Sequence, residues 1–248
     1  MKKSLEAVTK PLTSGSSLPL QHVAIIMDGN RRWAHMRKLP RMLGHREGVK
    51  SLKRLVKHAG KIGLSYLTVY AFSSENWQRS QEEVDYLFQL FTAVLQEELP
   101  ELCQNQVKLS FLGQLDKMPA NLKKSFDEAM QQTCHNTGLS LQVAINYGSR
   151  LEITEAIKQI ADGIKSGALT IEQITDKLVE QYLYTKGLPD PELLIRTGGQ
   201  MRLSNYMLWQ AAYAEFYVTP VLWPDFAPEH FDMAITEFTQ RERRFGGD

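Results

Sequence analysis

Five short apolar runs, separated from one another by segments with helical spacing, constrain this chain more than any other feature. The runs cover residues 23–27, 67–72, 107–112, 141–146 and 193–195. They predict buried strands, and strands that alternate with helices are typical of a mostly parallel central sheet with helices on both faces. Open α/β sheets bind ligands at the carboxyl ends of their strands. The predicted fold class is therefore α/β, with functional side chains expected where the runs end.

Two helix starts are marked by local sequence. Ser80 with Glu83, and Thr170 with Gln173, have the spacing of capping boxes. In a capping box the two side chains satisfy backbone N–H groups at the start of a helix. The sequence therefore predicts that helices begin at these two places.

The length of the chain fits a single globular domain. It has 248 residues, of which 43% are hydrophobic and 23% charged, and it contains no internal repeat. Residues 1–20 carry lysines and a Ser/Gly/Pro-rich stretch without a continuous apolar region, so we expect a flexible arm rather than a signal peptide or membrane span. Residues 21–248 are then expected to form one domain.

Charge and cysteine content exclude several classes of protein. The formal net charge is +1, whereas proteins that bind nucleic acid usually carry a surplus of clustered cations. Cys103 and Cys134 have neither the spacing of metal ligands nor the density of a disulfide scaffold. We therefore expect no nucleic-acid partner, reduced thiols and a cytoplasmic protein.

The end of the first apolar run carries a candidate phosphate site. The run stops at Asp28, which is followed by Gly29, Asn30, Arg31 and Arg32. A carboxylate beside flexible backbone N–H groups and fixed positive charge suits a magnesium-diphosphate group. Asp-Gly-Asn is also ordinary turn chemistry, so this segment alone leaves both interpretations open.

Two further runs end in the same kind of polar segment. Residues 73–79, which read Ser-Ser-Glu-Asn-Trp-Gln-Arg, follow one run, and residues 196–204 follow another. Within the latter, two successive glycines permit a tight turn, so Arg196 and Arg202 can converge on one diphosphate. Together the three segments indicate an enzyme for phosphorylated substrates.

Short motifs distributed over nearly the whole chain form a recognisable series. In order, they are Met27-Asp-Gly-Asn, Gly44-His45, Ala71-Phe-Ser-Ser-Glu-Asn-Trp77, Asn146-Tyr-Gly148, Leu194-Ile-Arg-Thr-Gly-Gly199, Arg202-Leu-Ser-Asn205, Leu208-Trp-Gln210, Tyr213-Ala-Glu215, Leu222-Trp-Pro224 and Arg241-Glu-Arg-Arg-Phe245. This series resembles the cis-prenyltransferase family, most closely the bacterial undecaprenyl diphosphate synthases. The resemblance implies a Mg²⁺-dependent, homodimeric transferase that adds isopentenyl diphosphate to an allylic diphosphate such as farnesyl diphosphate.

The resemblance also implies a product and a set of site residues. The product would be undecaprenyl diphosphate, the lipid carrier precursor for bacterial wall sugars, and a shorter chain is left open. Asp28 and Asn76 are expected to be catalytic, and Asp28 and Glu215 to bind the metal. The expected substrate-binding residues are Gly29, Asn30, Arg32, Trp33, Arg41, His45, Ser73, Trp77, Arg79, Arg196, Arg202 and Ser204. Trp77 as ordinary packing is left open. Arg31 departs from the family, which usually has a small residue there.

A long polyisoprene product needs an apolar tunnel. We expect it between the sheet and the helices near residues 84–99 and 118–130, although a filled core would have the same pattern. The candidate lining residues are Ala71, Leu87, Phe88, Phe91, Leu95, Val107, Leu109 and Leu139. Because no run is long enough to span a bilayer, a lipid product would require the protein to meet the membrane from outside.

The carboxyl-terminal segment, residues 206–245, is unusually aromatic. Its large side chains are Trp209, Tyr213, Phe216, Tyr217, Trp223 and Phe226. They exceed what a short segment can bury within itself, which favours a homodimer interface. Arg241, Arg243 and Arg244 are expected either to reach the partner's site or to remain solvated.

Two other classes of protein compete with this interpretation. The same fold serves as a non-catalytic partner subunit for other prenyltransferases, but such subunits have typically lost the aspartate and arginines that Asp28, Arg32, Arg196 and Arg202 retain here. A phosphohydrolase with an aspartate nucleophile at a strand end is the second alternative. That chemistry normally requires a second aspartate two residues later, where this chain has Asn30.

Overall fold

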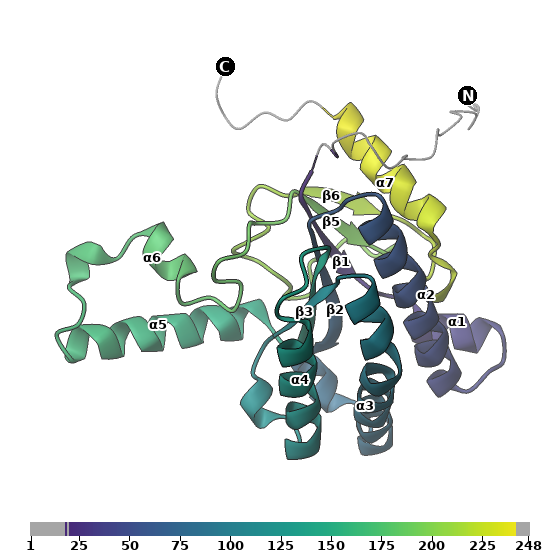
Figure 1. The fold of residues 1–248 in the computed structure, drawn as a ribbon, viewed down its shortest axis with the longest axis horizontal. Helices are drawn as coiled ribbons and strands as arrows, with labels where there is room; N and C mark the ends of the chain where they lie inside the picture. Colours follow the sequence, from purple (N-terminus) through teal and green to yellow (C-terminus); the bar gives the residue numbers. More distant parts are fainter. Residues whose placement is uncertain (1–17, 19, 242–248) are drawn as a thin grey trace.

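A six-stranded sheet organises the computed structural model, which describes Leu18 and residues 20–241 (Figure 1). The strand order is β3-β4-β2-β1-β5-β6, and every neighbouring pair is parallel. The strands are β1 (His22–Ile26), β2 (Tyr66–Ser73), β3 (Lys108–Leu112), β4 (Ser140–Tyr147), β5 (Leu193–Arg196) and β6 (Glu215–Val218). The predicted α/β class with a parallel sheet is confirmed.

The sequence-based prediction found five of these strands and missed β6. That strand has only four residues, lies at the edge of the sheet and is largely half-exposed. It pairs on one side only, with β5. The apolar signal of a buried strand is therefore weak in β6.

The helices differ greatly in length and in how they contact the sheet. They are α1 (Asn30–Met36), α2 (Arg41–Lys61), α3 (Gln81–Gln104), α4 (Ala120–Thr133), α5 (Ser149–Lys165), α6 (Asp176–Glu180) and α7 (Pro228–Gln240). Short 3₁₀ turns cover Ser74–Gln78, Leu115–Lys117, Ile171–Gln173 and Trp223–Asp225. The Thr170–Gln173 capping box forms as predicted, but it begins one of these 3₁₀ turns rather than a long helix.

One face of the sheet carries the large hydrophobic core. Alternate residues of β1, Val23 and Ile25, point to this face and are fully buried. The helices α2, α3, α4 and α7 supply the other side of this core, with residues such as Leu55, Leu122 and Ile235. Figure 1 shows α2, α3 and α4 side by side in front of the strands.

The opposite face is covered mainly by non-helical chain. Ala24 and Ile26 of β1 pack there with Tyr206 and Met207, which lie in the segment before β6. Tyr206 stacks on Tyr70 of β2 with ring centroids 4.4 Å apart. Only the start of α5 contributes to this layer, because α5 and α6 extend away from the sheet (Figure 1).

The predicted arm at residues 1–20 lies outside the described residues except at its end. Leu20 is buried in the core and Leu18 packs against it. Leu20 is therefore part of the folded core.

The strand order reverses between β1 and β5. The chain passes from β1 to β2 on one side and later returns to the other side of β1 with β5. In open α/β sheets such a reversal leaves a crevice at the carboxyl ends of the strands, where ligands bind. Asp28 follows β1 and Arg196 ends β5, so both lie at this crevice.

Close packing of α1 against α2 supports the crevice and depends on Gly44. A Cβ atom at Gly44 would lie 2.1 Å from the backbone oxygen of Asn30. Because that oxygen belongs to the backbone, moving it would distort the chain at Asn30. A side chain at position 44 would therefore push α2 away from the loop that holds Asp28.

We predict opposite effects for two glycine substitutions in α2. Gly44→Ala should lower the free energy of unfolding by about 1–3 kcal/mol because of overpacking. Gly60→Ala, where the nearest atom to the new Cβ is 4.0 Å away, should raise it by about 0.4–1 kcal/mol through helix propensity and chain entropy. Denaturant unfolding measures both, and equal effects would contradict the packing argument.

Candidate active site

A single carboxylate between two arginines forms the centre of the crevice. Arg196 Nη2 lies 2.9 Å from Asp28 Oδ2, and Arg32 Nη2 lies 3.1 Å from Asp28 Oδ1. Arg196 is only 4% exposed, so its charge needs a partner. Asp28 itself is partly open to solvent. The three predicted residues are thus brought together in one ion-paired group.

The loop after β5 is bound to the same group. Arg196 Nη1 donates to Ser204 Oγ at 2.7 Å and to the carbonyl of Arg202. Arg32 Nη1 donates to the carbonyl of Gly198 at 2.7 Å. Gly198 has a φ of 81°, a conformation that favours glycine. The loop therefore folds back over the strand end as its glycines predicted, while the side chain of Arg202 is exposed.

Three arginines and His45 surround Glu83, which is 5% exposed. Its carboxylate oxygens lie 3.1 Å from Arg79, 3.4 Å from His45 Nε2, 3.8 Å from Arg31 and 4.0 Å from Arg41. Three of these four residues are predicted substrate-binding residues. The fourth, Arg31, is the departure from the family noted above, and here it adds a cation to the group.

The sequence analysis assigned Glu83 to a capping box and missed that its carboxylate is surrounded by arginines and His45. Ser80 does stand at the start of α3, but no side chain caps the helix there. Instead Glu83 bonds to Arg79, four residues earlier. The spacing of an acid and an arginine by four residues was the signal available in the sequence.

The two groups together carry a surplus of positive charge. Five arginines contact only two carboxylates, Asp28 and Glu83. Neighbouring cations and backbone N–H groups make a site that favours anions. The geometry can therefore bind diphosphate groups, whose oxygens would replace part of the present pairing.

Buried polar atoms without partners point to the same conclusion. Among the described residues, the side-chain atoms Asn30 Oδ1, His45 Nε2 and Arg196 Nε are buried and make no hydrogen bond. Buried polar atoms normally find partners. Burial, and then the charge of Arg79, lower the pKa of His45, so its ring is neutral at pH 7.

The segment after β2 places Ser73, Asn76 and Trp77 beside the crevice. Ser73 and Asn76 form a capping box around the 3₁₀ turn Ser74–Gln78, in which Asn76 Oδ1 accepts from the backbone of Ser73 at 3.2 Å. Trp77 donates to Asn146 Oδ1 at 2.8 Å and is 41% exposed. Trp77 also packs edge-on against Phe72, so packing accounts for part of its role.

Two predicted residues lie apart from Asp28. Trp33 donates its indole N–H to Asp225 at 2.7 Å. Glu215 pairs with Arg241 at 2.9 Å and begins β6, level with Leu193 at the start of β5 rather than with Arg196 at its end. Within one chain, Glu215 and Asp28 therefore stand at opposite ends of the strands.

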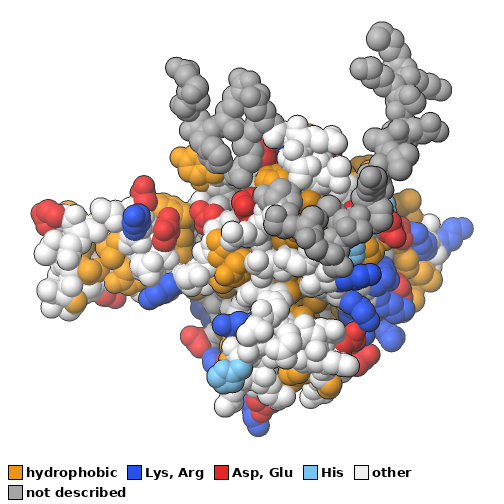
Figure 2. Space-filling view, turned by 45° about the horizontal axis from the view of Figure 1, so that its top comes forward, with side chains coloured by type: hydrophobic (Ala, Val, Ile, Leu, Met, Phe, Trp, Pro, Cys, Tyr) orange, Lys and Arg blue, Asp and Glu red, His pale blue; other side chains and the backbone are white. Residues whose placement is uncertain are grey.

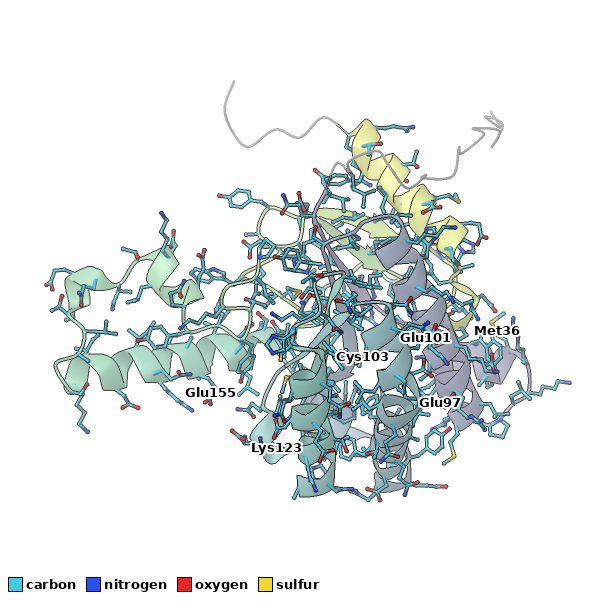
Figure 3. The ribbon with its side chains drawn as sticks, in the orientation of Figure 1. Met36, Glu97, Glu101, Cys103, Lys123 and Glu155 are labelled. Carbon is cyan, nitrogen blue, oxygen red and sulfur yellow. The ribbon has the colours of Figure 1, made fainter. Side chains whose placement is uncertain are left out.

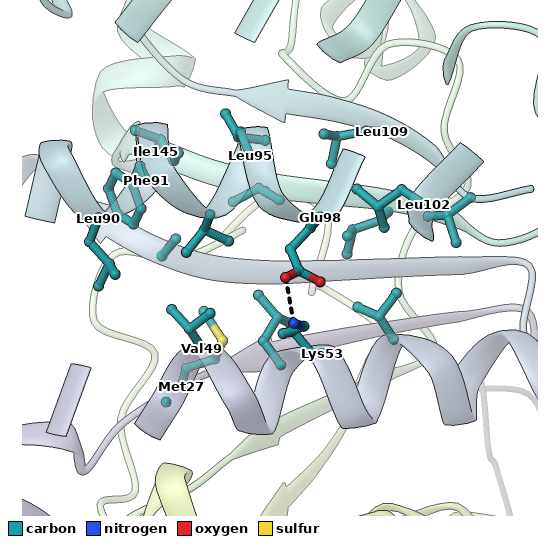
Figure 4. A pocket seen from close by; sticks show the side chains of 18 of the residues that line it. Met27, Val49, Lys53, Leu90, Phe91, Leu95, Glu98, Leu102, Leu109 and Ile145 are labelled. Atoms are coloured by element: carbon teal, nitrogen blue, oxygen red, sulfur yellow. Dashed lines mark ion pairs between the residues drawn. The ribbon is translucent and has the colours of Figure 1, made fainter. Parts of the chain in front are cut away.

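An apolar cavity of about 300 Å³ opens beside the polar groups (Figure 4). Met27, Asn30 and His45 line it at the polar end. Of the predicted lining residues, six are found there: Ala71, Leu87, Phe91, Leu95, Val107 and Leu109. Phe88 and Leu139 are not part of the lining; Phe88 packs on Phe72 and Trp77, and Leu139 belongs to the core.

The donor set at the crevice fits magnesium only if substrate oxygens take part. Among residues 20–241, no three His, Cys, Asp or Glu side chains gather closely enough to hold a metal. Magnesium is usually bound by one or two carboxylates together with phosphate oxygens and water. Asp28, partly open and at a strand end, suits that arrangement.

The chain matches a known family over most of its length. Residues 26–246 match the family described as "Putative undecaprenyl diphosphate synthase". The isoprenyl transferase of Bacillus subtilis is 50% identical over 244 residues, which are 98% of this chain and 94% of that protein. That of Geobacillus kaustophilus is 48% identical over 250 residues, 100% of this chain and 97% of that protein.

Solved structures show the same fold. Lavandulyl diphosphate synthase from Lavandula x intermedia, in complex with dimethylallyl diphosphate, superposes with a TM-score of 0.91 at 36% identity, covering 94% of this chain and 100% of that one. A probable undecaprenyl diphosphate synthase from Campylobacter jejuni superposes with a TM-score of 0.76 at 33% identity, and the match covers 92% of this chain and 99% of that one. The chain belongs to the undecaprenyl diphosphate synthase family and is a cis-prenyltransferase.

We predict that a bound diphosphate changes the titration of His45. In the free protein its pKa lies below 6.5, so the folded state loses stability as pH falls below 6.5. Inorganic pyrophosphate should raise this pKa because it adds negative charge. NMR titration of the histidine rings measures the change. His22, whose pKa burial lowers to about 4 at the other end of β1, should not respond; equal shifts of both rings would contradict the proposed site.

Proposed function

We propose that this enzyme adds isopentenyl diphosphate units in cis to farnesyl diphosphate and releases diphosphate at each step. The proposed product is undecaprenyl diphosphate, the precursor of the lipid carrier for peptidoglycan and other cell-wall sugars. One observation carries the proposal: Asn30 and His45 belong to the polar site and also line the apolar cavity. A substrate with a diphosphate head and an isoprene tail has the same two-part character.

The first diphosphate would be bound by the cations around Asp28 and Glu83. Ionisation of an allylic diphosphate leaves a carbocation and collects negative charge on the departing oxygens. Arg32, Arg41, His45 and the backbone N–H groups at Gly29 and the start of α1 would hold that charge. Mg²⁺ at Asp28 would neutralise part of it as a Lewis acid.

The second diphosphate would lie at the loop after β5. Arg196 and Ser204 are already hydrogen-bonded to each other, and the exposed side chain of Arg202 can complete the site from above the crevice. Arg196 also contacts Asp28, which would place isopentenyl diphosphate beside the allylic leaving group. Such proximity accounts for a large part of catalysis in two-substrate reactions.

The segment Ser74–Gln78 would cover the reacting carbons. Trp77 joins it to the end of β4 through Asn146, and exclusion of water protects a carbocation. Asn76 would orient the isopentenyl group as it loses a proton, the catalytic role expected from the resemblance.

We propose a homodimer interface that uses fewer of the aromatic side chains of residues 206–245 than the sequence analysis expected. Trp223, Phe226 and Tyr206 are buried in their own chain and are unavailable to a partner. Phe216 of the edge strand β6 is 44% exposed, and Ile157 and Ile171 of the α5–α6 arm are also exposed. Figure 2 shows hydrophobic side chains along that arm.

A second copy of the chain would also explain how Glu215 could serve a magnesium site although it lies far from Asp28 of its own chain. A partner subunit could bring its Glu215, beside Arg241, toward a magnesium site that the same chain cannot reach. Arg243 and Arg244, which were considered for a similar role, lie outside the described residues.

We propose a cytoplasmic enzyme that contacts the membrane peripherally. Both cysteines are free thiols, as expected in a reducing compartment. In the described part of the chain, no helix has the length and apolar character needed to cross a bilayer. A polyprenyl product must then pass from the apolar cavity into the membrane.

The reaction is tested with farnesyl diphosphate, radiolabelled isopentenyl diphosphate and Mg²⁺, with and without chelator, followed by separation of products by chain length. A magnesium-dependent ladder that ends near undecaprenyl diphosphate is expected. A shorter end point would reassign the product. A folded protein that incorporates no label would favour the non-catalytic partner subunit.

We predict that Asp28→Asn and Asp28→Ala each lower the turnover number by at least about 10²-fold, because charge stabilisation of the leaving group is lost. The asparagine variant can still accept hydrogen bonds from Arg196, which limits damage to the fold. The matched control is Asp162→Ala, an exposed aspartate on α5. Near-normal Mg²⁺-dependent turnover by both Asp28 variants would sink the mechanism.

We predict that Arg202→Ala acts on the second substrate. The KM for isopentenyl diphosphate should rise about 10- to 100-fold, as expected for loss of one charge-assisted phosphate contact. The KM for farnesyl diphosphate should change little. Initial-rate kinetics with each substrate varied in turn distinguish the two, and a rise confined to farnesyl diphosphate would reverse the assignment of the sites.

A further inference from the structure

Charged side chains interrupt one stretch of the otherwise apolar cavity wall. Lys53 and Lys57 of α2 face Glu98 and Glu101 of α3 across the seam between the two helices. Figure 4 shows the Lys53–Glu98 ion pair among apolar side chains of both helices, and Figure 3 labels Glu97 and Glu101 on α3. The rest of the wall, away from the polar end, is mostly Leu, Val and Phe.

The Lys53–Glu98 pair occupies the apolar stripe of each helix. On α3, Leu95 and Leu102 stand three residues before and four after Glu98, and all three side chains line the cavity. Residues at this spacing share one face of a helix. On α2, Val49 and Val56 flank Lys53 in the same way. The pair therefore occupies positions at which the helical periodicity of α2 and α3 predicts apolar side chains.

The position of the pair is not explained by stability alone. The side chain of Glu98 is 13% exposed and that of Lys53 37%. Removing the carboxylate from water costs free energy, while the ammonium of Lys53 keeps part of its hydration. The contact with Glu98 raises the pKa of Lys53, so the lysine stays charged at neutral pH.

The cavity is small for the product that the proposed function requires. Its volume of about 300 Å³ is at the lower end for pockets that hold drug-sized ligands. A growing polyisoprene needs more space with each added unit. Ile145 and Leu109 come from strands that are hydrogen-bonded to their neighbours in the sheet. The helices α2 and α3 meet at the seam through side chains, which is the type of contact that shifts in shear motions.

We propose that the Lys53–Glu98 ion pair limits product length by holding the α2–α3 seam closed and by placing charge in the wall through which the cavity would have to widen for a longer chain. The inference rests on the proposed polyprenyl-forming function. An apolar chain that advanced past the pair would have to strip water from both charges, which is unfavourable. Elongation therefore slows when the end of the chain arrives there, and the product is released.

The test compares three double variants with the unchanged protein. Lys53→Met/Glu98→Met removes both charges at similar side-chain length, and its products should be longer by one or more isoprene units. Lys53→Glu/Glu98→Lys keeps an ion pair and should retain the original length distribution. Lys124→Met/Glu128→Met, on α4, removes an exposed ion pair that does not line the cavity and should change nothing.

A binding measurement separates this inference from the proposed function. Quenching of tryptophan fluorescence by polyprenyl diphosphates of increasing length gives affinities without turnover, with farnesyl diphosphate as the reference in each protein. For chains longer than the natural product, Lys53→Met/Glu98→Met should bind at least about tenfold more tightly than the unchanged protein.

The outcomes are decisive in both directions. Unchanged or shorter products from the methionine variant, or an unchanged affinity for long chains, would overturn the role of the pair. A shift of the same size in the charge-reversed variant would also overturn it, because the ion pair is kept there. If the unchanged protein makes no polyprenyl product, the proposed function fails, and the affinities still decide whether the pair limits chain length.

Discussion

The ion pair between Asp28 and Arg196 is the contact on which the rest of the site depends. It joins the ends of β1 and β5 across the crevice, and the buried guanidinium then holds the following loop through Ser204 and the carbonyl of Arg202. A buried arginine without its carboxylate would be costly. The carboxylate proposed to bind magnesium is therefore also the group that keeps in place the segment proposed to bind the second diphosphate. One side chain would then serve both the structure and the proposed reaction.

The second constraint is the junction between charge and apolar space. The arginines around Asp28 and Glu83 outnumber the carboxylates that they contact, and this excess lies at one end of the cavity. An ordinary phosphate site is surrounded by solvent, and an ordinary core cavity has no charged end. Asn30 and His45, which lie at this junction, match the anionic head and apolar tail of the substrates proposed above.

The sequence could predict the strands and their polar ends, because burial on both faces makes short apolar runs that stop abruptly. It also placed Asp28 and Arg196 at one edge of the sheet, since parallel strands end at the same edge, and the family resemblance added Ser204. It could not supply the strand order, which depends on long-range packing. It missed β6 because a half-exposed edge strand has little apolar signal, and it assigned Glu83 to a helix cap because cap spacing and arginine pairing look alike along the chain.

The capping box at Ser73 and Asn76 has a consequence for how the covering segment works. The amide oxygen of Asn76 is held by the backbone of Ser73, so its NH₂ group is directed away from that bond. The orientation of the amide is thus fixed by the start of a 3₁₀ turn before any substrate arrives. A donor that is preorganised in this way loses little rotamer entropy on binding, and the local folding of five residues fixes the direction in which the proposed catalytic amide donates.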